Sequence, residues 1–103
     1  MRVKVGHRQL KVEFYGNADV EDDGHWGDYA RRTGIIRISA HGRPEDAQAE
    51  TLIHEVLHAL IESSGVEWDG DQEEDTCRTL APRLAAFIRD NREVVDRLQA
   101  MLA

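Results

Sequence analysis

Residues 51–61 read TLIHEVLHALI, and this stretch decides the fold because its apolar side chains recur at spacings of three and four, the period of an α-helix. In a helix, the spacing of four between His54 and His58 places both imidazoles one turn apart on the same face. Two imidazoles placed in this way can bind a single metal ion. Glu55 then projects about 100° around the helix from His54, close enough to act on a water molecule at that metal.

The expected helix extends beyond this stretch on both sides. Pro44 suits the first helical position, and Glu45 and Asp46 are acids in the first turn. Gly65 is a natural helix end. We therefore predict a single helix from Pro44 to Ser64. Its expected buried stripe consists of Leu52, Ile53, Val56, Leu57, Leu60 and Ile61.

The two histidines and the glutamate indicate a hydrolytic zinc ion. Such a site takes three protein ligands and leaves one position for water, from which Glu55 would remove a proton as general base and later pass it to the leaving amine. A structural zinc site is more often closed by four protein ligands that include cysteines, and the chain has a single cysteine, Cys77. We therefore expect one Zn²⁺ ion held by His54, His58 and a third protein ligand.

The third ligand is expected among the acids that open the next helix. Glu74 is the preferred candidate, because it lies one turn before the apolar Cys77 and can stand beside the buried face. Glu73 aligns with the same face almost as well, and Asp75 is a further alternative. Glu74 also has a rival role, because it stands three residues after Asp71, where a capping-box glutamate would bond back to the N-cap amide.

Other side chains are candidates for supporting roles around the metal. Metal-bound histidines donate their second N–H to a carboxylate or carbonyl, and Asp28, Asp69 and Asp71 remain unranked for this role. A developing oxyanion needs a donor besides the metal. Tyr29 or His25, in the segment before the next expected strand, could provide it.

The remainder of the chain indicates a small α+β domain. Alternating apolar residues on either side of residues 6–9 predict a β-hairpin with one buried face, and residues 33–39 predict a further strand. Residues 16–28 predict an acidic loop. Asp71 is expected to cap a second helix, which Asp90-Asn91 ends while capping a third. The third helix is expected to bury Val94, Val95, Leu98, Met101 and Leu102 in the core.

Composition narrows the class of protein further. With 103 residues and 41% apolar content, the chain is expected to be one domain, residues 1–103. Its net charge of −7 works against a nucleic-acid surface, because such affinity rests largely on Lys and Arg contacts. The sequence shows no apolar stretch of membrane-spanning length and no secretory signal, so we expect a cytoplasmic location in the producing or host cell. The expected partner is a protein or peptide.

These features resemble a minimal gluzincin, a small single-domain zinc metallopeptidase of the kind found in phage and prophage genomes. The resemblance rests on residues 50–60, ETLIHEVLHAL, and on the acidic helix start that follows them. It also covers residues 27–29 leading to the strand at residues 35–38, and residues 89–91 before the last helix.

The resemblance implies a zincin-like fold, in which a small twisted sheet packs on the metal-binding helix and two C-terminal helices follow. By this resemblance His54 and His58 match the histidine ligands, and Glu55 matches the catalytic glutamate. Glu74 is the most plausible match for the glutamate ligand, although the cluster of acids at residues 73–75 leaves its register open by one residue.

Two functions of different classes remain open from the sequence. The first is a zinc-dependent peptidase that holds an extended segment of another protein along an exposed edge of the strand at residues 35–39. The second is a non-catalytic or regulatory phage protein that keeps the zincin fold and binds a host protein or repressor. The intact Glu55 favours the peptidase, because a protein that uses zinc only for structure does not need it.

Overall fold

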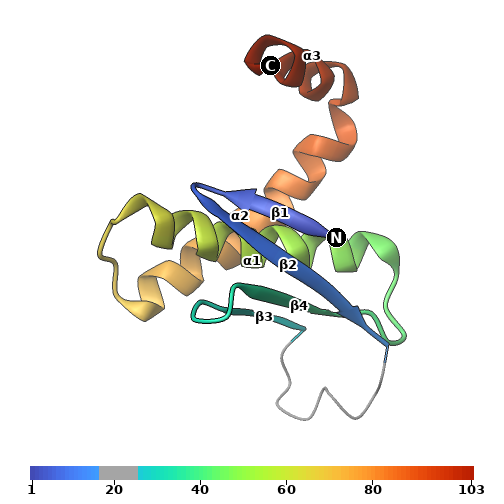
Figure 1. The fold of residues 1–103 in the computed structure, drawn as a ribbon. Helices are drawn as coiled ribbons and strands as arrows, with labels where there is room; N and C mark the ends of the chain where they lie inside the picture. Colours follow the sequence, from blue (N-terminus) through green and yellow to red (C-terminus); the bar gives the residue numbers. More distant parts are fainter. Residues whose placement is uncertain (17–25) are drawn as a thin grey trace.

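The structure, a computed structural model, describes residues 1–16 and 26–103, and this part of the chain folds as a four-stranded sheet with three helices (Figure 1). In chain order the elements are β1 (Arg2–Val5), β2 (Arg8–Tyr15), β3 (Gly27–Ala30), β4 (Ile35–Ser39), α1 (Glu45–Ser64), α2 (Gly70–Asp90) and α3 (Arg92–Leu102). The α+β class is confirmed, with the two expected helices after the helix that carries His54 and His58. Over the described ranges, no helix has the length and apolar character needed to cross a membrane.

The strands are ordered β1-β2-β4-β3 across the sheet. β1 and β2 form the expected antiparallel hairpin, in which Val3 lies opposite Leu10. β2 and β4 run parallel, and β3 returns antiparallel to β4. β4 begins at Ile35, two residues later than expected, because Thr33 and Gly34 form the turn from β3, where Gly34 has a φ of 73°.

The position of β4 corrects two expectations from the sequence. β4 is paired on both sides, since Ile36 lies opposite Val12 of β2 and opposite Tyr29 of β3. The expected peptide-binding edge at residues 35–39 is therefore wrong, and the edge on this side belongs to β3. β3 begins inside the segment expected to be loop, because its sequence GDYA has no alternating apolar pattern and its extended form comes from pairing with β4. Residues 17–25 of that loop lie outside the described residues.

The core lies between one face of the sheet and α1 (Figure 1). Leu10, Ile36 and Ile38 are fully buried, and the burial of Leu10 agrees with the buried face expected for the hairpin. Ala59 is the buried contribution of α1 to this cluster, with Leu52 and Val56 packed partly against it. The helix that carries the histidines is therefore also the one that covers the sheet.

Both ends of α1 are held by local interactions. Pro44 is the N-cap, and the helix starts at Glu45, one residue later than expected. The guanidinium of Arg43 donates to the carbonyl of Ser39 at 2.8 Å and to Thr51 Oγ1 at 2.7 Å, which fastens the end of β4 to the first turns of α1. At the other end Gly65 has a φ of 78°, as expected for a left-handed helix cap.

α2 begins earlier than the sequence indicated. The N-cap is Asp69, whose carboxylate accepts a hydrogen bond from the Gln72 backbone N–H at 2.7 Å, so the assignment of Asp71 as cap is wrong. Asp71 instead lies in the first helical turn. This shift removes the expected capping box, because its glutamate position would now be at Gln72. Glu74 is therefore free of a capping role.

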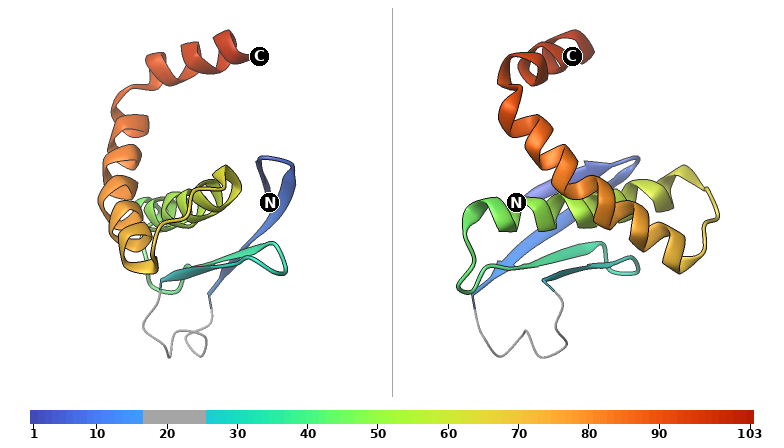
Figure 2. Two further views of the ribbon diagram at one scale, coloured as in Figure 1. Left: turned by 90° about the vertical axis from the view of Figure 1, so that its left-hand side faces the viewer. Right: turned by 180° about the vertical axis from the view of Figure 1, so that it is seen from behind.

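α3 corrects the expectation of a third buried helix. None of its residues, all of which the structure describes, is buried, and Leu98 is 45% exposed. Asn91 does end α2, where its side-chain Nδ2 donates back to the Phe87 carbonyl at 2.9 Å, but it makes no side-chain cap for α3. Figure 2 shows the second half of α2 leading away from the sheet and α3 standing apart from it. The spacing of apolar residues predicted the helix correctly, but it could not say what would cover them.

Candidate metal centre

The two histidines of α1 meet a carboxylate of α2. His54 Nε2 lies 3.1 Å from Glu74 Oε1, and His58 Nε2 lies 2.8 Å from the same oxygen. One ligand atom from each of these three residues lies within 4.8 Å of the others, so the group could hold a metal ion. Two imidazole nitrogens and one carboxylate oxygen are a donor set suited to zinc, with a fourth position left for water.

Glu73 contacts the opposite side of His58. Its Oε2 accepts a hydrogen bond from His58 Nδ1 at 2.6 Å. Neighbouring residues on a helix project about 100° apart, so Glu73 and Glu74 reach different nitrogens of one ring. With the Nδ1 proton held by Glu73, a neutral His58 presents the lone pair of Nε2 on the side of His54 and Glu74.

The other acidic candidates have different partners. Asp75 pairs with Arg78 at 3.3 Å, and its side chain is largely exposed. Asp69 caps α2, and Asp28 lines the cleft beside the site. Asp28, Asp69 and Asp71 were the aspartates expected to orient a histidine; the structure describes all three, and none of them accepts a hydrogen bond from His54 or His58, whereas Glu73 accepts one from His58. The spacing of residues in the sequence could not distinguish an acid that orients a histidine from one that binds the metal, because both roles need an acid in the first turns of α2.

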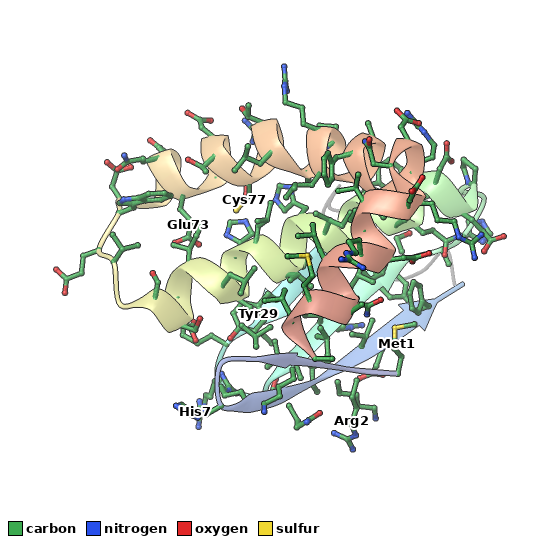
Figure 3. All side chains as sticks on the ribbon, turned by 90° about the horizontal axis from the view of Figure 1, so that it is seen from above. Met1, Arg2, His7, Tyr29, Glu73 and Cys77 are labelled. Atoms are coloured by element: carbon green, nitrogen blue, oxygen red, sulfur yellow. The ribbon has the colours of Figure 1, made fainter. Side chains whose placement is uncertain are left out.

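Small side chains allow α2 to approach α1 closely at this point. Cys77 and Ala81 are buried on α2, and Ala59 is buried on α1. Figure 3 shows Glu73 and Cys77 pointing from α2 toward α1. Burial, followed by the nearby charges of Glu73 and Glu74, raises the pKa of the Cys77 thiol to about 11. The thiol therefore acts as a small neutral packing group beneath the carboxylates.

Arg78 holds the second oxygen of Glu74. Its Nη2 donates to Glu74 Oε2 at 3.2 Å, four residues further along α2. Oε1 of the same carboxylate faces both histidines. The arginine therefore favours an orientation in which a single oxygen of Glu74 points toward the space shared by His54 and His58. The sequence placed Arg78 on the same face as Glu74 but did not single it out.

Hydrogen bonding sets the protonation of the metal-free site. Burial alone would lower the pKa of His58, but hydrogen bonds to Glu73 and Glu74 outweigh it and raise that pKa. Burial would raise the pKa of Glu74, and the contacts with His58 and His54 outweigh it, so that pKa is lowered. Without metal, His58 thus favours its protonated form and Glu74 its ionised form, and a cation bound there would compete with the proton on His58.

Glu55 is the buried acid of this site. It is 7% exposed, and burial raises its pKa to about 7; the charge of His58 opposes this rise, and the charges of Glu74 and Asp28 add to it. Gly27 of β3 lies against it, since a Cβ built on this glycine would stand 3.4 Å from Glu55 Oε2. The carboxyl group is therefore enclosed between α1 and the edge strand.

A cleft of about 920 Å³ opens onto these groups. Its walls include Gly27 and Asp28 from β3, and the two histidines and Glu55 from α1. α2 contributes Glu73, Glu74, Ala81 and Pro82. A volume of this size is at the upper end of the range for small-molecule sites. The cleft therefore has room for a segment of polypeptide beside β3.

Of the two candidate oxyanion donors, Tyr29 and His25, the structure describes Tyr29. The Tyr29 hydroxyl donates to Glu62 Oε1 at 3.1 Å and accepts from Arg8 Nη1 at 3.2 Å, so it ties β3 and β2 to the last turns of α1. Burial, and then the hydrogen bond to Glu62, raises the pKa of this phenol. The ring lines the cleft, but its hydroxyl is engaged away from Glu74. His25 lies outside the described residues.

Comparison with known proteins does not bear on the roles of these residues. The gluzincin resemblance, drawn from the motif at residues 50–60, stays a prediction. No family model, no curated protein and no solved structure matches the chain.

Proposed function

We propose that this protein is a zinc-dependent metallopeptidase, with His54, His58 and Glu74 as ligands and Glu55 as general base. One observation carries the proposal: Nε2 of both histidines converges on a single oxygen of Glu74, beside a buried glutamate that no structural zinc site requires. Three protein ligands with an open position are the arrangement of catalytic zinc sites.

The residues of the chain divide the work of hydrolysis between them. Bound zinc would polarise the scissile carbonyl and make a water molecule acidic enough to attack it near neutral pH. Glu55 takes the proton from the attacking water and delivers it to the leaving amine, so the enzyme neither gains nor loses a proton. Glu73 holds the ring of His58 in one tautomer, and Arg78 keeps one oxygen of Glu74 directed at the histidines.

The edge strand β3 is the element best suited to hold the substrate. It is paired only with β4 in the described sheet, so its other side can accept an extended peptide by backbone pairing. Its residues Gly27 and Asp28 line the cleft next to Glu55. An extended segment bound there would run beside Glu55, which favours unfolded protein or a flexible loop as substrate.

Replacement of Glu55 by Gln separates catalysis from metal binding. Glu55→Gln is expected to retain one zinc per chain and to lose about 10²–10⁴-fold in the rate of cleavage of denatured, fluorescently labelled casein, because only proton transfer is removed. Zinc content is measured by elemental analysis and cleavage by the release of fluorescence. Glu50→Gln is the matched control, since Glu50 lines the same cleft and is exposed.

Two results would contradict the proposal. Cleavage that survives in Glu55→Gln at the wild-type rate would rule out this residue as the base. Wild-type protein that binds no zinc, or His58→Ala that binds it undiminished, would rule out the metal centre itself.

A further inference from the structure

The C-terminal part of the chain exposes a continuous run of apolar side chains. We define the arm as residues 80–102, which comprise the second half of α2 and all of α3. In Figures 1 and 2 the arm leads away from the sheet and α1, with α3 at its far end. The large apolar residues of the arm that are at least 36% exposed are Leu80, Leu84, Phe87, Ile88, Val94, Leu98, Met101 and Leu102.

These side chains recur at helical spacing rather than at random. Leu80, Leu84 and Phe87 follow one another at intervals of four and three along α2, and Val94, Leu98 and Met101 repeat the pattern along α3. This spacing places each set on one stripe of its helix. Single exposed apolar residues are common on protein surfaces, but two adjoining stripes of this size mark an interaction surface.

α3 also needs packing contacts with another apolar surface to be stable as a helix. It has 11 residues, and a helix of that length is marginal in water because nucleation is costly. None of its residues is buried, so packing against the rest of its own chain supplies little stabilisation. An apolar partner on the exposed stripe would supply it.

The charge of the arm indicates which partner fits. The arm carries four arginines and three acids, Arg83, Arg89, Asp90, Arg92, Glu93, Asp96 and Arg97, and so has a net charge of +1. The whole chain has a net charge of −7, so the residues outside the arm carry a net charge of −8. Two arms, each with a net charge of only +1, therefore repel one another far less than two of the acidic bodies would. α3 itself carries two basic and two acidic residues, Arg92, Glu93, Asp96 and Arg97, and this balance allows ion pairs between two copies at the rim of a contact.

We propose that the arm is a homodimerisation surface, occupied by the arm of a second copy of this chain. A two-fold arrangement uses the same patch on both copies, and it closes after two chains. The apolar stripes of α2 and α3 then pack against those of the partner as in a helical bundle. The arm projects from the body, so this contact keeps the two acidic bodies apart.

Sedimentation equilibrium of the wild-type protein tests the proposal directly. We expect a mass twice the 11.7 kDa of a single chain at high micromolar concentration, with dissociation on dilution. Leu98→Lys, and separately Leu84→Lys, is expected to weaken dimerisation at least tenfold, equal to about 1.4 kcal/mol, because each buries a charge in the apolar contact. Val66→Lys is the matched control, because Val66 lies outside the arm and is 46% exposed, against 45% for Leu98.

A second measurement needs no variant. The unfolding temperature of a dimer rises with protein concentration, so that of the wild type is expected to rise while that of Leu98→Lys stays constant. A wild-type protein that is monomeric at every concentration would overturn the proposal. Assemblies larger than two, or a Val66→Lys variant that dissociates as readily as Leu98→Lys, would also overturn it.

Discussion

At the scale of single residues, two neighbouring glutamates have different roles at one histidine. Glu74 Oε1 faces the Nε2 atoms of His54 and His58, while Glu73 Oε2 contacts His58 Nδ1. A carboxylate that shares the space between two histidines can bind a metal, whereas one that contacts the far nitrogen can only orient the ring. Side chains of the same chemistry are therefore distinguished here by the nitrogen that each one reaches.

Isosteric replacements of the two glutamates are expected to differ in their effect on zinc affinity. Glu74→Gln removes a charged ligand and is expected to weaken zinc binding by more than about 100-fold. Glu73→Gln removes only the acceptor for His58 and is expected to weaken binding by about 10–100-fold. Competition with a chromophoric chelator measures both. Asp75→Asn is the control and is expected to bind zinc as the wild type does, while a greater loss in Glu73→Gln than in Glu74→Gln would reverse the assignment.

At the scale of elements, the site depends on the close approach of β3 to α1. Gly27 permits this approach, because a Cβ at this position would stand 2.7 Å from Thr51 Cγ2 and 2.9 Å from the Arg37 carbonyl. The second of these atoms belongs to the backbone of β4 and cannot turn away. The edge strand can therefore lie beside Glu55 only with glycine at this position.

Gly27→Ala is expected to destabilise the fold by about 1–3 kcal/mol, because the added methyl group overpacks the contact between β3 and α1. Displacement of β3 is also expected to reduce peptide cleavage while zinc affinity is retained, since the ligands lie on α1 and α2. Urea unfolding measures the change in stability. Gly70→Ala is the control, because a Cβ there meets no atom within 4 Å, and alanine at a helical position is neutral or slightly stabilising. Equal midpoints for the two variants would contradict this account.

At the scale of the whole molecule, the candidate metal centre lies between two helices that have few buried side chains in common. α1 packs on the sheet, while in α2, all of which the structure describes, Cys77 and Ala81 are the buried residues. An ion held by His54, His58 and Glu74 would link the two helices directly. Binding energy at the site is therefore also folding energy for α2.

Zinc is expected to raise the unfolding temperature of the wild-type protein. At a free concentration of 100 times its dissociation constant, a ligand stabilises the folded state by about 2.7 kcal/mol. For a domain of this size that corresponds to about 10–20 °C. Differential scanning fluorimetry at fixed protein concentration, with and without a chelator, measures the shift. His58→Ala is expected to show little or no shift, and an equal shift in that variant would place the zinc elsewhere.

Local patterns in the amino-acid sequence by themselves determined much of this protein. The period of residues 51–61 predicted α1 and put both histidines on one face, because helical geometry depends only on neighbours along the chain. The same reasoning located the hairpin, the strand β4 and the starts of α2 and α3 to within a few residues. It also narrowed the acid beside the histidines to residues 73–75.

Only the tertiary structure decided how these pieces meet. Which acid of α2 reaches which nitrogen depends on where the helix starts, after the N-cap Asp69, and on how it crosses α1 over Cys77 and Ala81. The edge strand was not visible in the sequence, because β3 is extended only through its pairing with β4. The exposure of α3 could not be predicted from the sequence either. Periodicity shows that a helix has an apolar face, but contacts between residues distant in sequence decide what covers that face.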